Sequence, residues 1–273
     1  MPHLGSQAVG HTGPLSGCVT DCAIAYSVMA GPDRRMSNTW AQPRVEIVGY
    51  NNTEALRGKR LGVYRPFFEH CDDQIAKSCN ETVQKLVQNY GCEVVEIRIP
   101  RLDELKTAHF ITICTESLLG THQMKPEDQG NLQPSVRSVF GLAKNFTADD
   151  VARAMRLRTY FMKYMNEHVF TECDVVVTPT TGEVAGPVLG YPHGEDILDG
   201  ELTGRIMRFA QIGNFTGIPA ITVPASYTDE GLPIGIQFMS KWWDELTLFQ
   251  MASAVEIECE KRKPELYMPV LKQ

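Results

Sequence analysis

Residues Asp174–Thr178 read DVVVT, and this short apolar run decides the fold class. Its β-branched residues do not alternate with polar ones, which is typical of a strand buried on both faces. Pro179 and Gly182 follow closely and end the run. Such a strand needs helices on either side, so the sequence predicts an α/β fold with a mixed, largely buried β-sheet flanked by helices on both faces.

A parallel strand–helix–strand unit is predicted upstream of this run. Arg60–Tyr64 (RLGVY) and Glu93–Ile97 (EVVEI) have the composition of short strands. The residues between them, Asp72–Tyr90, have helical periodicity and stop at Gly91. Two strands joined by a helix over about thirty residues lie parallel in one sheet.

The remaining elements follow from periodicity and turn residues. Thr147–Asp150 resembles a capping box with Asp in the usual place of Glu, so it opens a helix that runs to about Phe170. Further helices are predicted at 15–30, 102–118 and 203–215, and a closing amphipathic helix at 245–258. Strands are predicted at 220–224 and 234–239, and irregular surface stretches at 32–57 and 120–134.

Composition excludes several functional classes. The 273 residues carry 26 basic and 33 acidic side chains, a net charge of −7, without a Lys/Arg run, so we expect no nucleic-acid partner. No run of 18 apolar residues occurs, so we expect no transmembrane segment. Peripheral membrane contact and a homodimer stay open.

The cysteines favour a reducing environment. Eight of them are scattered through the chain without a CxxC pair or a Cys/His ligand cluster, so we expect buried thiols, with no metal and no other cofactor. No signal peptide is recognised at the start. The expectation is a reducing intracellular compartment, with attachment to an internal membrane left open.

Single residues indicate little chemistry by themselves. His11 in a Gly-flanked loop is more typical of a backbone-bonded residue than of a catalytic base, and His109 in an apolar helix is more typical of packing. Arg208 favours a structural ion pair over a substrate carboxylate. A hidden Cys–His dyad is the weakest alternative, because sequence does not show the geometry it needs.

The polar residues after DVVVT leave two interpretations open. The carboxyl end of a buried strand is where α/β folds bind ligands, so we expect a cleft there. The hydroxyls of Thr178, Thr180 and Thr181 either bind a substrate or cap the turn, and the residues alone do not decide between these roles.

Several segments together resemble the amidase signature family. They are VGHTGPLSGCVTDCAIAYSVMAGPD (9–33), DVVVTPTTG (174–182) and NFTGIPAITVPASYTDEGLPIGIQF (214–238). Within that family, the stretches 91–113, 140–150 and 204–209 are most similar to plant-type fatty acid amide hydrolases. The resemblance implies an amidase signature fold and a lipid amide substrate such as an N-acylethanolamine.

The resemblance also implies a mechanism that this sequence does not contain. Family members use a serine nucleophile, a second serine and a lysine that relays the proton, with backbone amides as the oxyanion hole. These elements lie upstream of the part matched by Val9–Asp33, and no equivalent Gly/Ser-rich loop occurs here. We therefore assign no catalytic residue, and expect residues 1–273 to be the carboxyl-terminal portion of one amidase signature domain.

What the resemblance does assign is the wall of an acyl channel. Three stretches line it in the plant-type lipid amidases, and the residues matching them here are Phe110 and Ile113, Leu142 and Phe146, and Thr203 and Met207. Most are apolar, as a lipid tail requires, although core packing explains each one equally well. Two functions follow as hypotheses: part of a serine amidase for fatty acid amides, or an inactive pseudoenzyme or acyl-lipid-binding module.

Overall fold

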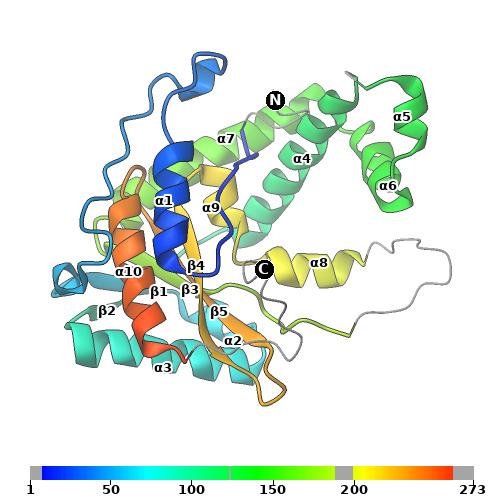
Figure 1. The fold of residues 1–273 in the computed structure, drawn as a ribbon. Helices are drawn as coiled ribbons and strands as arrows, with labels where there is room; N and C mark the ends of the chain where they lie inside the picture. The colour runs from blue at the N-terminus through cyan, green and yellow to red at the C-terminus, as the bar shows by residue number, and fades with distance from the viewer. Residues whose placement is uncertain (1–7, 123, 188–198, 261–273) are drawn as a thin grey trace, which may run out of the picture.

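The computed structural model describes residues 8–122, 124–187 and 199–260. Within them, five strands form a single mixed sheet in the order β2-β1-β3-β5-β4 (Figure 1). The strands are β1 (Arg60–Val63), β2 (Glu93–Glu96), β3 (Val175–Pro179), β4 (Ala220–Tyr227) and β5 (Pro233–Ser240). The predicted fold class is confirmed.

The strand–helix–strand unit forms as predicted. Helix α3 (Asp73–Tyr90) joins β1 to β2, and the two strands pair in parallel. Gly91 ends α3 in the left-handed conformation, with φ of 69°, which glycine adopts without the penalty of a Cβ. A short helix, α2 (Arg65–Glu69), follows β1 directly.

Strand β3 is the centre of the sheet. All five of its residues are buried; β1 pairs with it in parallel on one side and β5 antiparallel on the other. At its start the Asp174 carboxylate accepts the Arg60 backbone N–H at 2.8 Å, and the two side chains form an ion pair at 3.3 Å. This contact aligns the beginnings of β1 and β3.

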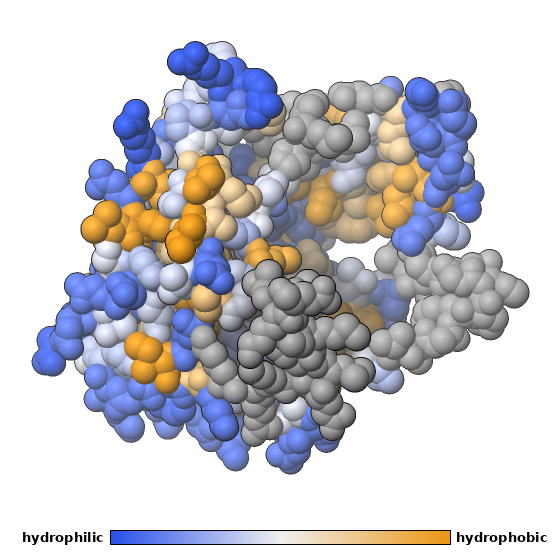
Figure 2. Space-filling view, in the orientation of Figure 1, coloured by the Kyte–Doolittle hydropathy of each residue, from blue (hydrophilic) through white to orange (hydrophobic). Residues whose placement is uncertain are grey.

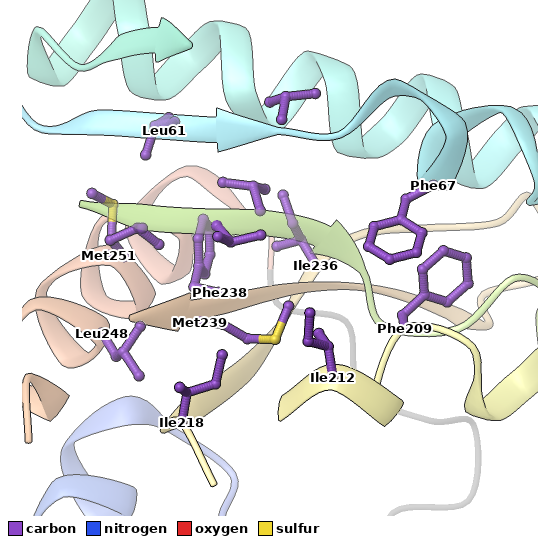
Figure 3. Packing of buried hydrophobic residues seen from close by; sticks show 14 of the residues in the cluster. Leu61, Phe67, Phe209, Ile212, Ile218, Ile236, Phe238, Met239, Leu248 and Met251 are labelled. Atoms are coloured by element: carbon purple, nitrogen blue, oxygen red, sulfur yellow. The ribbon is translucent and has the colours of Figure 1, made fainter. Parts of the chain in front are cut away.

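Helices cover both faces of β5. Helices α3 and α10 (Glu245–Glu258) contact β4 and β5, and the hydroxyls of Ser78 on α3 and Ser226 on β4 are hydrogen-bonded on that face. Helix α9 (Gln211–Thr216) lies on the opposite face, where Met239 lies beside Ile212, while Phe209 packs on Phe67 near the end of β3 (Figure 3). The outer strand β4 is less covered, because Ala220, Thr222 and Pro224 are exposed.

The other helices form a lobe beside the sheet (Figure 1). Helix α4 (Leu102–Thr121) packs on α6 (Pro134–Ala143) and on α7 (Ala148–Tyr164). The predicted capping box opens α7, with Thr147 and Asp150 each bonding the other's backbone N–H. The lobe also contains α5 (Pro126–Gly130), whereas α8 (Gly200–Met207) lies apart from it (Figure 1). The π-helical turn η3 (Met165–Val169) continues α7, and its Met165 and Val169 are buried in the core. Helix α1 (Val19–Met29) and the turns η1 (Ser37–Thr39) and η2 (Thr53–Leu56) lie elsewhere.

The structure corrects the predicted first helix, the predicted loop at 120–134 and the predicted helix at 203–215. The first helix begins at Val19 rather than at 15, with Cys18 as its N-cap and Leu15 fully exposed. The loop predicted at 120–134 contains α5, and α6 was missed. The helix predicted to run to about Phe170 does so, with the π-helical turn η3 at its end. The helix predicted at 203–215 is two helices, α8 and α9.

The last helix is not amphipathic in the expected sense. Every residue of α10 from Thr247 to Val255 is buried. Its small polar side chains face the segment before η2: Gln250 donates to the Gly49 carbonyl at 3.1 Å, and Ser253 donates to the Tyr50 carbonyl at 3.2 Å. Part of the stretch predicted as a surface excursion therefore covers α10.

Gly62 in β1 provides a test of the packing around the central strands. A Cβ at this position would lie 2.5 Å from Cys173 Sγ and 3.2 Å from Ile97 Cδ1, so Gly62→Ala forces the core apart. We expect a loss of about 2 kcal/mol in the free energy of unfolding, measured by urea denaturation.

The matched control is Gly141→Ala in α6, where an added Cβ meets nothing within 4 Å. This change should leave the stability unchanged or raise it by up to about 1 kcal/mol, because alanine favours the helix. Equal losses of unfolding free energy in the two variants would contradict the close approach of Cys173 and Ile97 to Gly62.

Candidate functional site

One face of α4 carries the first part of the predicted channel wall. Lys106, Phe110 and Ile113 are spaced by four and three residues, so they lie along the same side of the helix. Phe110 is 39% exposed, while Ile113 is half-buried and packs against the core. The exposed Phe110 ring beside the packed Ile113 side chain makes this face available to an apolar ligand.

Helix α6 brings the second part of the wall onto this face. The Phe146 ring, just after α6, meets the Phe110 ring edge to face, with 6.3 Å between the centroids. Leu142 on α6 is 48% exposed. The structure therefore brings two of the three predicted stretches together.

Helix α8 carries the third part and approaches the start of α4. A Cβ at Gly204 would lie 3.4 Å from Lys106 Nζ. Met207 is half-buried, and the neighbouring Ile206, which the sequence interpretation did not name, is 38% exposed. The Thr203 hydroxyl donates to the Asp199 carbonyl at 2.7 Å, so in this conformation it does not donate to a ligand.

The space-filling view shows the molecule hollowed between the lobe of α5 and α6 and helix α8 (Figure 2). Hydrophobic side chains gather on the wall of this hollow over α4 and α6. Five of the six predicted wall residues lie on α4, α6 and α8, and Phe146 lies just after α6. That they bind an acyl chain stays a prediction.

A separate groove of about 340 Å³ lies on the other side of α4, against α7. Its apolar lining residues include Ala108, Ile111 and Leu157, and acidic residues such as Asp103 and Asp150 stand among them. This groove does not involve any of the predicted wall residues.

The threonines after β3 are engaged within the protein. Thr178 donates to the Pro179 carbonyl and accepts from Gln237 Nε2 at 3.0 Å. The Thr180 hydroxyl pairs with Thr222 at 3.2 Å, and Thr181 donates to the Glu183 carbonyl at 2.8 Å. Of the two roles left open, these contacts favour capping of the turn.

Both histidines behave as the sequence interpretation favoured. His11 bonds the Val9 carbonyl through Nδ1 at 3.1 Å. His109 is buried, and its Nε2 lies 2.6 Å from Asn214 Oδ1. Asn214 was not recognised as a partner, although it is the first residue of the quoted 214–238 segment.

Arg208 departs from its prediction. Its Nη2 lies 2.6 Å from His70 Nδ1 and its guanidinium lies over the Phe67 ring, and among the described residues it pairs with no carboxylate. Arg205 pairs with Glu183 at 2.7 Å. The expected structural ion pair thus belongs to Arg205.

The thiols are poorly suited to nucleophilic catalysis. All eight cysteines lie among the described residues and remain thiols. Burial raises the pKa of Cys79 and Cys173 to about 12, and that of Cys114 to about 11. Because the thiolate is the reactive form, these shifts disfavour the Cys–His alternative.

Among the described residues, no three His, Cys, Asp or Glu side chains come together as ligands for a metal ion. None of the helices in these ranges combines the length and apolarity that crossing a bilayer requires.

Comparison with known proteins gives concordant results. A family model described as Amidase matches residues 5–249. A fatty acid amide hydrolase of Medicago truncatula is 37% identical over 275 residues, covering 97% of this chain and 45% of that protein. A fatty acid amide hydrolase of Arabidopsis thaliana is 33% identical over 268 residues, covering 95% of this chain and 44% of that protein. The chain spans less than half the length of these relatives.

Solved structures agree on the fold. A glutamyl-tRNA(Gln) amidotransferase subunit from Thermotoga maritima matches with a TM-score of 0.75 at 20% identity, over 93% of this chain and 54% of that one. A bacterial aryl acylamidase matches with a TM-score of 0.71 at 22% identity, over 90% and 52%. With the family model matching most of its length, this chain belongs to the amidase signature family.

Proposed function

We propose that this chain is the carboxyl-terminal part of a serine amidase that hydrolyses the carbon–nitrogen bond of fatty acid amides, N-acylethanolamines among them. The chain contributes the wall that holds the acyl tail. The nucleophilic serine, its partner serine and the relay lysine come from the preceding part of the domain. The proposal rests on one observation: exposed apolar side chains of α4 and α6 line a hollow bordered by α8.

The similarity to plant fatty acid amide hydrolases supports the lipid substrate. At 37% and 33% identity over nearly the whole chain, the part that corresponds to the channel wall is included in the match. An acyl tail gains about 0.8 kcal/mol for each buried CH2 group, so binding by apolar walls grows with chain length.

A second candidate is an acyl-lipid-binding module without turnover. It is favoured by the exposed apolar side chains of α4 and α6, which can hold a tail without a catalytic group. The two candidates share a binding site and differ only in whether a catalytic part acts on the bound lipid.

Membrane contact, a homodimer and a reducing intracellular location are also proposals. A second apolar patch lies over α1, where Ile24 is 59%, Val28 81% and Met29 51% exposed (Figure 2). A patch of this kind suits either a bilayer surface or a second copy of the chain. The proposed reducing compartment rests on the sequence, in which eight scattered cysteines form no CxxC pair.

Substitutions in the wall should weaken binding of a fluorescent long-chain N-acylethanolamine. Phe146→Asp and Met207→Arg each place a charge where the tail would lie, and we expect at least about tenfold weaker binding in a fluorescence titration. Val48→Arg is the control, because Val48 is 91% exposed on a different segment. Unchanged affinity in both wall variants would show that Phe146 and Met207 do not contact the acyl tail.

Turnover should require the missing catalytic part. The chain alone should not hydrolyse an N-acylethanolamine, whereas a chimera that joins it to the amino-terminal part of the Medicago truncatula relative should release the free amine. Met207→Arg in the chimera should lower kcat/KM. A folded chimera that binds the lipid without hydrolysing it would favour the binding module.

A further inference from the structure

The segment Ala8–His11 before α1 has no regular secondary structure, yet Val9 is only 2% exposed. Side chains from three helices hold its backbone. Glu116 on α4 accepts the Ala8 N–H at 3.1 and 3.2 Å, and Arg158 on α7 lies 3.5 Å from the Ala8 carbonyl. Asn214 on α9 donates to the Val9 carbonyl at 2.6 Å.

The contact of Asn214 fixes the direction of a longer hydrogen-bond chain. A carbonyl oxygen only accepts, so the Asn214 group that faces the Val9 carbonyl is the NH2 group. The Asn214 oxygen therefore faces His109 and accepts as well. His109 has to donate from Nε2, which leaves one arrangement of protons: His109 to Asn214, and Asn214 to Val9.

His11 supplies the second donor to the Val9 carbonyl. Its Nδ1 lies 3.1 Å from the same Val9 carbonyl, so it donates too and places its proton on Nδ1. The Val9 oxygen then has a donor for each of its lone pairs. The two histidines thus donate from different ring nitrogens, His109 from Nε2 to Asn214 and His11 from Nδ1 to Val9.

We propose that His109 and Asn214 are positioning residues, and that their directed hydrogen-bond chain fixes the segment Ala8–His11 against α4 and α9. His109 directly precedes Phe110 on α4, so the same hydrogen bonds set the rotation of α4 about its axis. This role does not depend on which substrate the hollow binds, and so it goes beyond the proposed function.

Packing alone does not account for this pair. The His109 ring meets the Phe215 ring edge to face at 6.0 Å, a contact that an apolar side chain of similar size could make. A buried imidazole and amide pay a desolvation cost unless every polar atom is matched. Aspartate cannot replace Asn214, because it would set two acceptors against each other.

The first test reads the protonation of His109 directly in the wild-type protein. Long-range 1H–15N spectra of the 15N-histidine-labelled protein distinguish the two neutral tautomers and the charged ring. We expect His109, assigned by the signal missing from a His109→Gln sample, to be the Nε2–H tautomer at about pH 7.5. An Nδ1–H tautomer or a charged ring would overturn the proposal.

The second test separates the hydrogen bond from packing. Glutamine can donate to Asn214 Oδ1, whereas leucine fills a similar volume without a donor. Amide hydrogen exchange of the peptide covering residues 8–14 should stay slow in His109→Gln and become about tenfold faster in His109→Leu. Equal exchange in the two variants would reduce His109 to a packing role and overturn the proposal.

Asn214→Asp tests the second link of the chain. It should also accelerate exchange of the 8–14 peptide, because an acceptor then faces the Val9 carbonyl. Asn145→Asp is the matched control: it makes the same chemical change at an exposed site just after α6, where the amide bonds only the carbonyls of its own turn. Identical exchange in both variants would refute the role of Asn214.

The pH dependence of stability gives an independent readout. Burial lowers the pKa of His109 below its usual 6.5, opposed by the bond to Asn214. The unfolded chain therefore binds a proton more readily, so the contribution of neutral His109 is full above about pH 6.5 and is lost as the pH falls. Glu116, Arg158 and His11 are the other charged or titratable groups on this segment, and all remain in the variant.

Wild-type protein should consequently lose more stability than His109→Gln between about pH 7.5 and about pH 5. His122→Gln is the control, since it makes the same substitution at an exposed site just after α4. Parallel stability curves for wild type and His109→Gln would contradict a buried neutral ring.

Discussion

The structure depends on the pairing of one strand, because the backbone of β3 lies in apolar surroundings on both faces. Val175, Val176, Val177 and Thr178 have no exposed surface. An unpaired N–H or C=O in such a place costs as much as a lost hydrogen bond, so β3 needs a partner on each side. One partner, β1, lies parallel to it and precedes the helical lobe in the chain, and the other, β5, lies antiparallel and follows that lobe.

The same constraint extends to the candidate site through a buried amide. Gln237 on β5 donates to the Thr178 hydroxyl on β3 and to the Phe209 carbonyl, each at 3.0 Å. Phe209 stands between α8 and α9 and is fully buried. The bond from Gln237 thus fixes the turn between α8 and α9 against the centre of the sheet. Because Met207 ends α8, this bond also sets the position of Met207 at the hollow.

Elements whose signals are local could be predicted from the sequence. The apolar run of β3, the glycine after α3 and the capping box of α7 each act within a few residues, and all three were recognised. Helix α6 was missed although Pro134 stands at its first turn and Val136 and Phe140 follow at helical spacing. That miss came from reading glycine and proline as loop signals.

Features that depend on tertiary contacts could not be predicted. Nothing in residues 203–215 shows that the chain changes direction at Phe209, because periodicity does not report what a side chain packs against. The small polar residues of α10 suggested a solvent face, whereas Gln250 and Ser253 bond carbonyls about 200 residues away. For the site, the resemblance to lipid amidases named Phe110 and Ile113, but the hollow beside them depends on where α6 and α8 lie (Figure 2).

The contact between α1 and α10 has a consequence for how the protein is made. The Val19 N–H, near the start of α1, donates to the Glu256 carboxylate, and the Tyr26 ring packs against Phe249 at 5.6 Å. A ribosome delivers α1 long before α10, so the earlier helix waits through more than 200 residues of synthesis for its partner. Until α10 emerges, the apolar side of α1 is available to chaperones, and this part of the core closes only after α10 has been translated.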